Sequence, residues 1–292
     1  MRSEQPQILQ PIPTGERYNL RAMEATKRLD WKRLMEEALT APGDLGQAYS
    51  RFHDYSITNM LFFRMQGITE PVASYQTWRS VGRQVMKGAK AKEVIVPRLI
   101  KEKPEEKPDP NETPDEKQTR VSRLVGFTVM RAIFTLSDTT GKDLTPAPIP
   151  GWELQAALDK LGVRQIAFTS TDGNLQGYSR GLEFAVNPVA INPRKTMFHE
   201  LGHIVLSHTT SQRLAEYQTH RGIMEFEAEG AAYIAMNELG LLDEATATRS
   251  RGYIKHWLHD EQPPEQSIRQ VFRAADAIIR AGRESPATPS PV

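Results

Sequence analysis

Hydrophobic and polar positions change their spacing along the first half of the chain, and each spacing predicts a different element. Apolar side chains first recur at helical intervals and then gather in two strand-like runs. We expect helices over 19–40, 45–66 and 76–86, and strands over 93–100 and 121–136. The intervening residues, 101–120, contain four prolines and no large apolar side chain, which predicts a mobile insertion within a hairpin. Asn59 lies in an apolar helical run, where it would either satisfy a neighbouring loop or act as a ligand.

The second half of the chain has the pattern of helices with a small sheet. Strands are predicted over 164–170 and 182–191, and Pro188 would place the second of these at a sheet edge. Residues 177–180 predict an exposed link, and 207–221 a polar link between helices. We expect helices over 152–162, 196–208, 222–240, 244–259 and 265–283.

These elements predict an α+β fold in two parts, an α+β N-terminal domain and a mainly helical C-terminal domain with a small sheet. The boundary is expected where proline and glycine gather, between the last strand of the first part and the first helix of the second. The predicted limits are a flexible arm 1–18, a first domain 19–140, a linker 141–151, a second domain 152–283 and a disordered tail 284–292.

The predicted helix 196–208 contains the chemistry that stands out most. His199 and His203 are four residues apart, so a helix places both imidazoles on one face, where they can bind one metal ion. Glu200 lies beside them and is the candidate general base for a water molecule at that metal. The flanking side chains are apolar, and polar groups on such a helix need a partner, which a metal ion supplies. The alternative is a pair of hydrogen-bonded core histidines.

A third metal ligand is expected from the acidic helix 222–240. Glu225 and Glu229 share one helix face, whereas Glu227 points elsewhere. Catalytic zinc commonly takes two histidines, one carboxylate and a water molecule, so one glutamate would bind the metal and the other would orient an imidazole. Glu229 is preferred as the ligand because it adjoins a run of small residues, with Glu225 as the alternative. His208 is a further candidate in place of a glutamate. The strand 182–191 precedes the metal helix and is a candidate wall for an extended peptide.

Basic residues are concentrated between residues 75 and 101, next to two aromatic side chains. Cationic side chains can follow a phosphate backbone and aromatic rings can stack on unpaired bases, a combination suited to single-stranded nucleic acid. On the predicted helix 76–86, Arg79 and Arg83 would share a face that Lys87 extends. The other interpretation is a solvated basic face with Trp78 packed in the core. The candidate DNA-binding residues are Tyr75, Trp78, Arg79, Arg83, Lys87, Lys90 and Lys92.

Overall composition narrows these interpretations only slightly. The 292 residues carry a net charge of +1, so any attraction to nucleic acid must come from local charge. The absence of cysteine excludes disulfides and cysteine-ligated zinc, and agrees with a reducing compartment. The N-terminus has no apolar segment typical of a secretory signal, and no run is long enough to span a membrane. We therefore expect a cytoplasmic protein without a membrane partner.

Over roughly residues 20–280 the chain resembles the plasmid-encoded ArdC antirestriction family. Three groups of residues carry the resemblance: Ser56-Ile57-Thr58-Asn59 with Trp78, Gly82, Val85, Lys87-Gly88 and Lys90; Phe134 with Asp138-Thr139-Thr140-Gly141; and His199-Glu200-Leu201-Gly202-His203 with Glu225-x-x-Ala228-Glu229. The resemblance implies a single-stranded-DNA-binding N-terminal domain, a zincin-like metallopeptidase domain, and protection of incoming conjugative plasmid DNA from host restriction.

Three functions follow from the residues and the resemblance together. The first is an antirestriction protein that binds single-stranded DNA and carries a peptidase centre, acting on a host protein such as a restriction component. The second is a DNA-binding restriction blocker whose metal site is structural, with little proteolysis. The third is a metallopeptidase with no DNA role. The expected cofactor is one divalent metal ion, zinc in the first place, with manganese or cobalt as alternatives.

Overall fold

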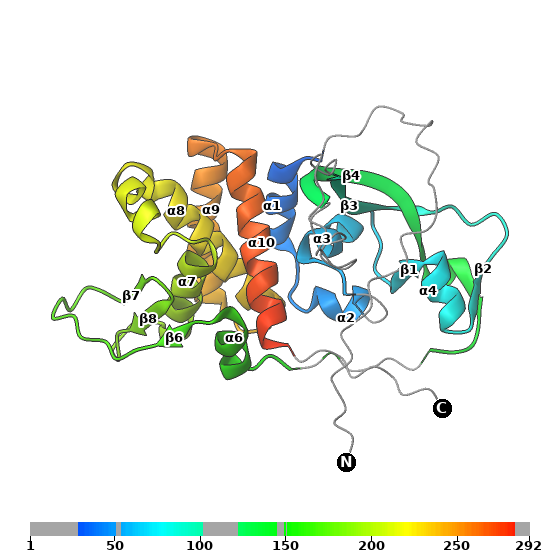
Figure 1. The fold of residues 1–292 in the computed structure, drawn as a ribbon. Coiled ribbons are helices and arrows are strands. Elements are labelled where there is room, and N and C mark those ends of the chain that lie inside the picture. The colour runs from blue at the N-terminus through cyan, green and yellow to red at the C-terminus, as the bar shows by residue number, and fades with distance from the viewer. Residues whose placement is uncertain (1–28, 51–53, 102–121, 145–148, 150, 284–292) are drawn as a thin grey trace, which may run out of the picture.

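The computed structural model describes residues 29–50, 54–101, 122–144, 149 and 151–283. The molecule is elongated (Figure 1): a sheet and the helix α4 lie at one end, and a second small sheet with α7 lies at the other. The last helix, α10, runs between the two ends. This arrangement confirms the predicted α+β class. Within the described residues, no helix has the length and apolar character that a membrane crossing requires.

The N-terminal helices are shorter than their patterns predicted. They are α1 (Trp31–Thr40), α2 (Leu45–Tyr49) and α3 (Ile57–Met65). Asp30 and Ser56 cap α1 and α3, each accepting a hydrogen bond from the backbone N–H three residues on. The expected single helix 45–66 is therefore two helices, and most of 19–30 lies outside the described residues.

A three-stranded antiparallel sheet follows, with the order β1, β4, β3. Its strands are β1 (Val72–Ser74), β3 (Lys92–Lys101) and β4 (Ser122–Thr135). β3 and β4 form the predicted hairpin, and Lys101 pairs with Ser122 on either side of residues 102–121, which the structure does not describe. β3 is an edge strand, and two side-chain amides of α3 and its C-terminus occupy its free backbone groups. The Asn59 amide exchanges two 2.9 Å hydrogen bonds with the backbone of Ile95, and Gln66 pairs with Glu93 in the same way.

The predicted helix 76–86 is wrong in its second half. The helix α4 (Tyr75–Ser80) ends early because Gly82 adopts a positive φ of 79°, which glycine tolerates better than other residues. The chain then continues as β2 (Arg83–Val85), which pairs with β5 (Thr139–Gly141). Arg79 and Arg83 therefore lie on different elements and share no helix face.

The small sheet of the C-terminal half has the order β6, β8, β7. These strands, β6 (Arg164–Gln165), β7 (Gly177–Arg180) and β8 (Glu183–Val186), follow the helix α6 (Leu154–Leu161). Two predictions are corrected. Residues 177–180 form a strand at the sheet edge and not an exposed link, and β8 lies in the centre and ends before Pro188. Both β7 and β8 contact α7, the helix that contains His199 and His203, and of these two strands β7 is the one at the sheet edge.

Four helices complete the fold: α7 (Pro193–Val205), α8 (Ser211–Glu238), α9 (Glu244–His256) and α10 (Glu265–Gly282). A π-helical turn (Trp257–Glu261) separates the last two. The predicted polar link 207–221 is wrong in most of its length, because α8 already begins at Ser211. α7 and α8 approach closely at Gly202, where an added Cβ would lie 3.0 Å from the carbonyl oxygen of Ala228. This close approach brings the two histidines of α7 up to the glutamates of α8.

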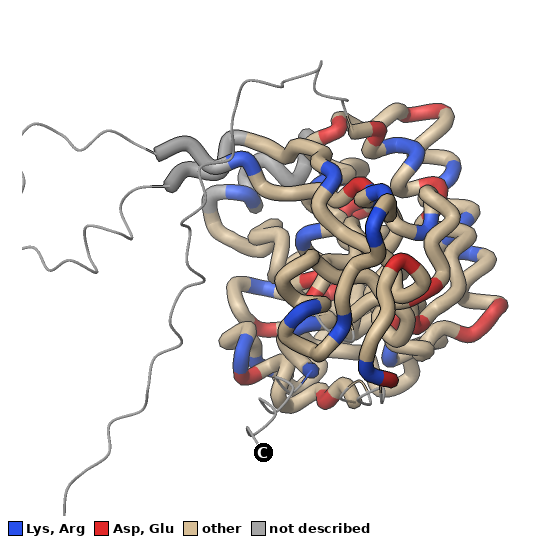
Figure 2. Tube along the Cα trace, turned by 90° about the vertical axis from the view of Figure 1, so that its right-hand side faces the viewer, with Lys and Arg blue, Asp and Glu red and all other residues tan. Residues whose placement is uncertain are grey.

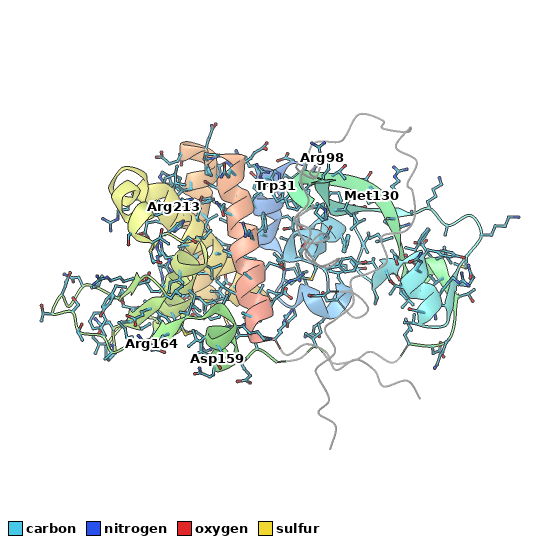
Figure 3. All side chains as sticks on the ribbon, viewed as in Figure 1. Trp31, Arg98, Met130, Asp159, Arg164 and Arg213 are labelled. Carbon is cyan, nitrogen blue, oxygen red and sulfur yellow. The ribbon has the colours of Figure 1, made fainter. Side chains whose placement is uncertain are left out.

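The hydrophobic core runs without interruption from the N-terminal helices to the C-terminal ones. Trp31 of α1, labelled in Figure 3, contacts Phe127 of β4 and Phe272 of α10. At the C-terminal end of α8, the carboxylate of Glu238 accepts hydrogen bonds from the backbone N–H groups of Leu45 and Gly46. The core therefore contains residues from both sides of the predicted linker 141–151 and joins the two predicted domains. The predicted domain limits themselves remain predictions.

Candidate metal centre

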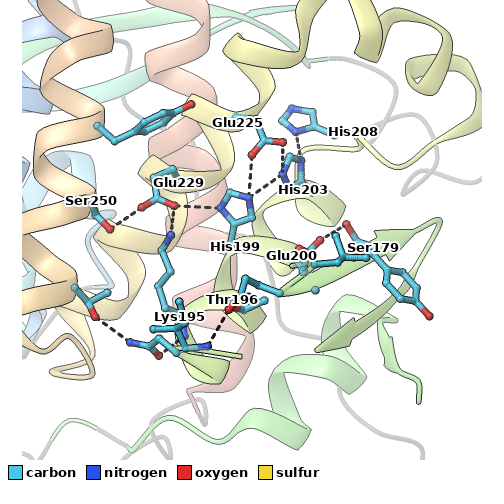
Figure 4. Close-up of a pocket in the computed structure, with 18 of the residues that line it drawn as sticks. Ser179, Lys195, Thr196, His199, Glu200, His203, His208, Glu225, Glu229 and Ser250 are labelled. Carbon is cyan, nitrogen blue, oxygen red and sulfur yellow. Dashed lines mark hydrogen bonds and ion pairs between the residues drawn. The ribbon is translucent and has the colours of Figure 1, made fainter. Parts of the chain in front are cut away.

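Three side chains from α7 and α8 converge on one point (Figure 4). Nε2 of His199 lies 3.2 Å from Nε2 of His203 and 3.2 Å from a carboxylate oxygen of Glu225, and Nε2 of His203 lies 3.7 Å from the other oxygen. Ligands about 2.0–2.1 Å from a tetrahedral metal ion stand roughly 3.3–3.4 Å apart. The three groups therefore have the spacing that one divalent ion requires, and they form a candidate metal-binding group.

The remote nitrogens of both imidazoles support the same conclusion. Nδ1 of His199 is 3.2 Å from Oε2 of Glu229, and Nδ1 of His203 is 3.1 Å from Nδ1 of His208. When Nδ1 carries the proton and donates it outward, the Nε2 lone pair is available to a metal ion. The residues present thus fit the divalent cofactor that the sequence predicts.

Glu225 and Glu229 take different roles in this geometry. Glu225 faces the Nε2 atoms, whereas Glu229 lies behind His199 and also contacts Lys195 Nζ at 2.6 Å and Ser250 Oγ at 2.6 Å. Sequence position favoured Glu229 as the ligand, but the geometry favours Glu225. The expectation that the other glutamate orients an imidazole agrees with the position of Glu229.

Burial and neighbouring charges determine the protonation of His199 and Glu229. Burial alone would lower the pKa of His199, but Glu225 and Glu229 outweigh it and raise this pKa to about 9. Burial would likewise raise the pKa of Glu229, but His199, Lys195 and Ser250 together lower it to about 2. Glu229 is thus a carboxylate over the whole neutral range, and His199 holds a proton until a metal ion displaces it.

Glu200 is held from the edge strand of the small sheet. Ser179 of β7 donates a 2.7 Å hydrogen bond to its Oε2, and the carboxylate is nearly buried. Gly177 lets the strand come this near, because an added Cβ would lie 2.6 Å from the Thr196 methyl group. Glu200, His199 and His203 line the same pocket, which has a volume of about 780 Å³. The candidate base and the candidate metal ligands therefore share one cavity.

His208 is not among the three grouped ligands. It follows α7 and is almost fully buried between His203 and Glu227, whose Oε2 lies 2.9 Å from its Nε2. Burial is the main cause that lowers the pKa of His208, which favours the neutral ring. Glu227, which the sequence placed away from the site, is thus part of its surroundings.

Several side chains that contact Glu200 or Glu229 were not predicted from the sequence. Lys195 had a usable signal, since it lies four residues before His199 and so shares its helix face. Ser179 and Ser250 come from β7 and α9, and no spacing in the sequence connects them to α7.

The predicted DNA-binding residues lie at the other end of the molecule and fall into two groups. Trp78 is fully buried and donates a hydrogen bond to the Phe134 carbonyl, so its ring offers no face to a base. Arg83 donates to Thr139 and to the carbonyl of Lys142, and Lys92 lies 3.5 Å from Asp138. Trp78, Arg83 and Lys92 therefore make contacts within the fold.

Four other candidates remain on the surface. Tyr75 is 41% exposed, and Arg79, Lys87 and Lys90 are exposed. Figure 2 views this end of the molecule and shows Lys and Arg spread across it, with Asp and Glu among them. The structure therefore retains a basic, partly aromatic surface, smaller than the one that the sequence predicted.

The site geometry defines a candidate metal centre of two histidines and one glutamate, with Glu200 in the same pocket. In the N-terminal half of the chain, residues 20–130 match the family model of the N-terminal domain of anti-restriction factor ArdC. Residues 20–130 are thus similar to the ArdC N-terminal domain, in agreement with the resemblance seen in the sequence.

Two crystal structures of the antirestriction ArdC protein from plasmid R388 are also similar. The metal-free structure is 18% identical, has a TM-score of 0.47 and covers 86% of this chain and 94% of its own. The Mn(II)-bound structure is 17% identical, with a TM-score of 0.47 and coverage of 87% and 98%. No curated protein matches the chain.

Proposed function

We propose that this chain is an ArdC-type antirestriction protein with a metal-dependent peptidase centre and a single-stranded-DNA-binding N-terminal domain. One observation carries the peptidase part: His199, His203 and Glu225 converge on a point inside a pocket that Glu200 also lines. The matched ArdC N-terminal domain supports the antirestriction part.

The residues of the pocket suit the hydrolysis of a peptide bond. His199, His203 and Glu225 would hold the ion, and two histidines with one glutamate favour zinc, with manganese or cobalt as alternatives. A divalent ion held there supplies Lewis acidity, which polarises a carbonyl group and makes water easier to deprotonate. Glu200 would accept the proton from that water and later pass it to the leaving amine, while Ser179 keeps its carboxylate aimed at the cavity.

An extended substrate would lie along β7. This strand is at the sheet edge, lines the pocket through residues 177–179 and touches Glu200. An edge strand can accept an extended peptide through main-chain hydrogen bonds, so the proposed substrate wall moves from 182–191 to 177–180. The substrate would be a host protein such as a restriction component, encountered in the cytoplasm.

Single-stranded DNA would bind at the opposite end of the molecule. Tyr75 offers a stacking surface, and Arg79, Lys87 and Lys90 offer exposed positive charge. Because α4 lies at one end of the molecule in Figure 1, and β7 and α7, which line the pocket, lie toward the other, bound DNA would leave the pocket open to a protein substrate.

Replacing Glu200 with glutamine separates the peptidase from the alternative in which the metal is structural. Metal binding should survive, because Glu200 is not among the grouped ligands, while hydrolysis of a fluorogenic peptide library should fall by about 10²–10⁴-fold. Glu153→Gln, at an exposed position far along the chain, is the matched control. If restriction protection in a conjugation assay survives Glu200→Gln in full, the protein acts as a DNA-binding blocker.

The remaining alternative, a peptidase with no DNA role, has a separate test. A gel-shift titration with single-stranded DNA at low salt should show binding that weakens as salt rises. Changing Arg79, Lys87 and Lys90 together to glutamine should remove it. A wild-type protein that binds no single-stranded DNA at low salt would establish the DNA-independent alternative.

A further inference from the structure

A line of hydrogen bonds leads from the candidate metal point into the protein interior. It starts at Nδ1 of His203, passes through both ring nitrogens of His208 and ends on the carboxylate of Glu227, with steps of 3.1 and 2.9 Å. The three residues are 6%, 2% and 6% exposed, so water has little access to this line. The backbone supports the same arrangement, since the His208 N–H donates to the His203 carbonyl at 2.9 Å.

Only one arrangement of protons lets this line coexist with a metal ion. If Nε2 of His203 binds the ion, Nδ1 of His203 carries the proton and must donate it. Nδ1 of His208 then accepts that hydrogen bond, and the proton of His208 sits on Nε2. The Glu227 carboxylate accepts from this Nε2–H. Each atom has one role, and the carboxylate at the end selects it.

We propose that His208 and Glu227 are positioning residues that fix His203 in the tautomer presenting Nε2 to the metal. The inference rests on the proposed metal function. In this arrangement a carboxylate orients each of the two ligand histidines. Glu229 orients His199 directly, and Glu227 orients His203 through the imidazole of His208.

The alternative is that His208 only fills space between α7 and α8. Three variants separate the ideas. His208→Phe keeps a ring of similar size but removes the acceptor, and His208→Asn places an amide oxygen near the position of Nδ1. Glu227→Gln removes the charge that selects the proton arrangement. His256→Phe is the control, because His256 forms a similar 2.8 Å pair with Asp260 on the exposed surface, far along the chain from α7.

Two measurements on each variant test the proposal, after circular dichroism has shown that the variant is folded. Zinc affinity by chelator competition should fall about 10–100-fold in His208→Phe and in Glu227→Gln. It should be largely restored in His208→Asn and unchanged in His256→Phe. Ring ¹⁵N NMR of the metal-free protein, at a pH where His203 is neutral, should show its proton on Nδ1 in the wild type and on Nε2 in His208→Phe.

The outcomes of the two measurements are separable. A wild-type protein that binds no zinc, manganese or cobalt overturns the proposed metal function, whereas the tautomer of His203 still tests the line of hydrogen bonds. Unchanged zinc affinity and an unchanged Nδ1–H tautomer in His208→Phe would show that His208 is a packing residue. If His208→Phe fails to fold, Glu227→Gln and His208→Asn provide the same two readouts.

Discussion

One end of the molecule contains the candidate metal centre on α7 and α8 (the metal end), and the other contains the basic surface near α4 and β2 (the basic end). Charged side chains occur at both ends, but their surroundings differ. At the metal end, Glu200, Glu229 and His203 are buried, His199 is partly buried, and each has a hydrogen-bonding partner within the protein. At the basic end, the side chains that have partners, such as Arg83, use them to join strands. The exposed ones lie on the surface.

This contrast separates a preorganised candidate centre from a candidate binding surface. Removing polar groups from water is costly unless hydrogen bonds compensate, so a buried group with all its partners keeps one orientation. An exposed cation keeps its hydration and its mobility, and it contributes mainly through charge. Residues at the two ends should therefore fail differently when they are changed.

The largest expected effect concerns the two aromatic residues of the basic end. Trp78→Ala removes a fully buried ring and should lower the free energy of unfolding by about 3–5 kcal/mol. Tyr75→Ala should leave stability nearly unchanged and weaken single-stranded-DNA binding by about 1–3 kcal/mol. Urea unfolding and DNA titration on both variants measure the two effects. A stable Trp78→Ala protein that has lost DNA binding would make Trp78 a stacking residue after all.

At the metal end, replacing Glu225 and replacing Glu229 should reduce metal affinity by different amounts. Glu229→Gln removes an orienting partner and should weaken metal binding about 10–100-fold. Glu225→Gln removes a ligand and should weaken binding by more than that. Chelator competition measures both affinities, with circular dichroism as the check on folding. The reverse order would restore Glu229 as the third ligand.

The sequence predicted the metal end better than the basic end for a physical reason. His199 and His203 are on one helix, where spacing alone determines a common face. The choice between Glu225 and Glu229 depends on how α8 sits on α7, which the contact at Gly202 decides. No pattern in the sequence contains that contact.

At the basic end, the backbone conformation of Gly82 determines where the helix ends, and the apolar pattern does not show this. Arg79 and Arg83 have helical spacing, but the positive φ of Gly82 ends the helix between them. The fate of Trp78 was likewise undetermined, because an amphipathic ring near basic residues fits both a core and a surface. The hairpin of β3 and β4 was predictable, since strand-like apolar runs flank a proline-rich insertion.

Metal affinity should depend on pH because the centre must release a proton. In the metal-free protein, Glu225 and Glu229 raise the pKa of His199 to about 9, and the ion binds only the deprotonated ring. Zinc affinity should therefore rise about tenfold per pH unit between roughly pH 7 and 9 and level off above that. Glu229→Gln should level off at a lower pH. Competition titrations over this range measure both, and an affinity that is flat from pH 7 would contradict a protonated His199.

The smallest expected effect compares two lysines that are neighbours in sequence. Lys92 lies 3.5 Å from Asp138 and is partly exposed, so Lys92→Gln should cost at most about 1 kcal/mol of stability. Lys90 is exposed, and Lys90→Gln should leave stability unchanged but lower the salt slope of single-stranded-DNA binding by about 0.7. Thermal unfolding and DNA titrations at several salt concentrations give the two numbers. Equal effects of both changes on the salt slope would show that an ion pair within the protein does not withdraw a lysine from DNA binding, and the distinction between partnered and exposed cations would then apply to the metal end alone.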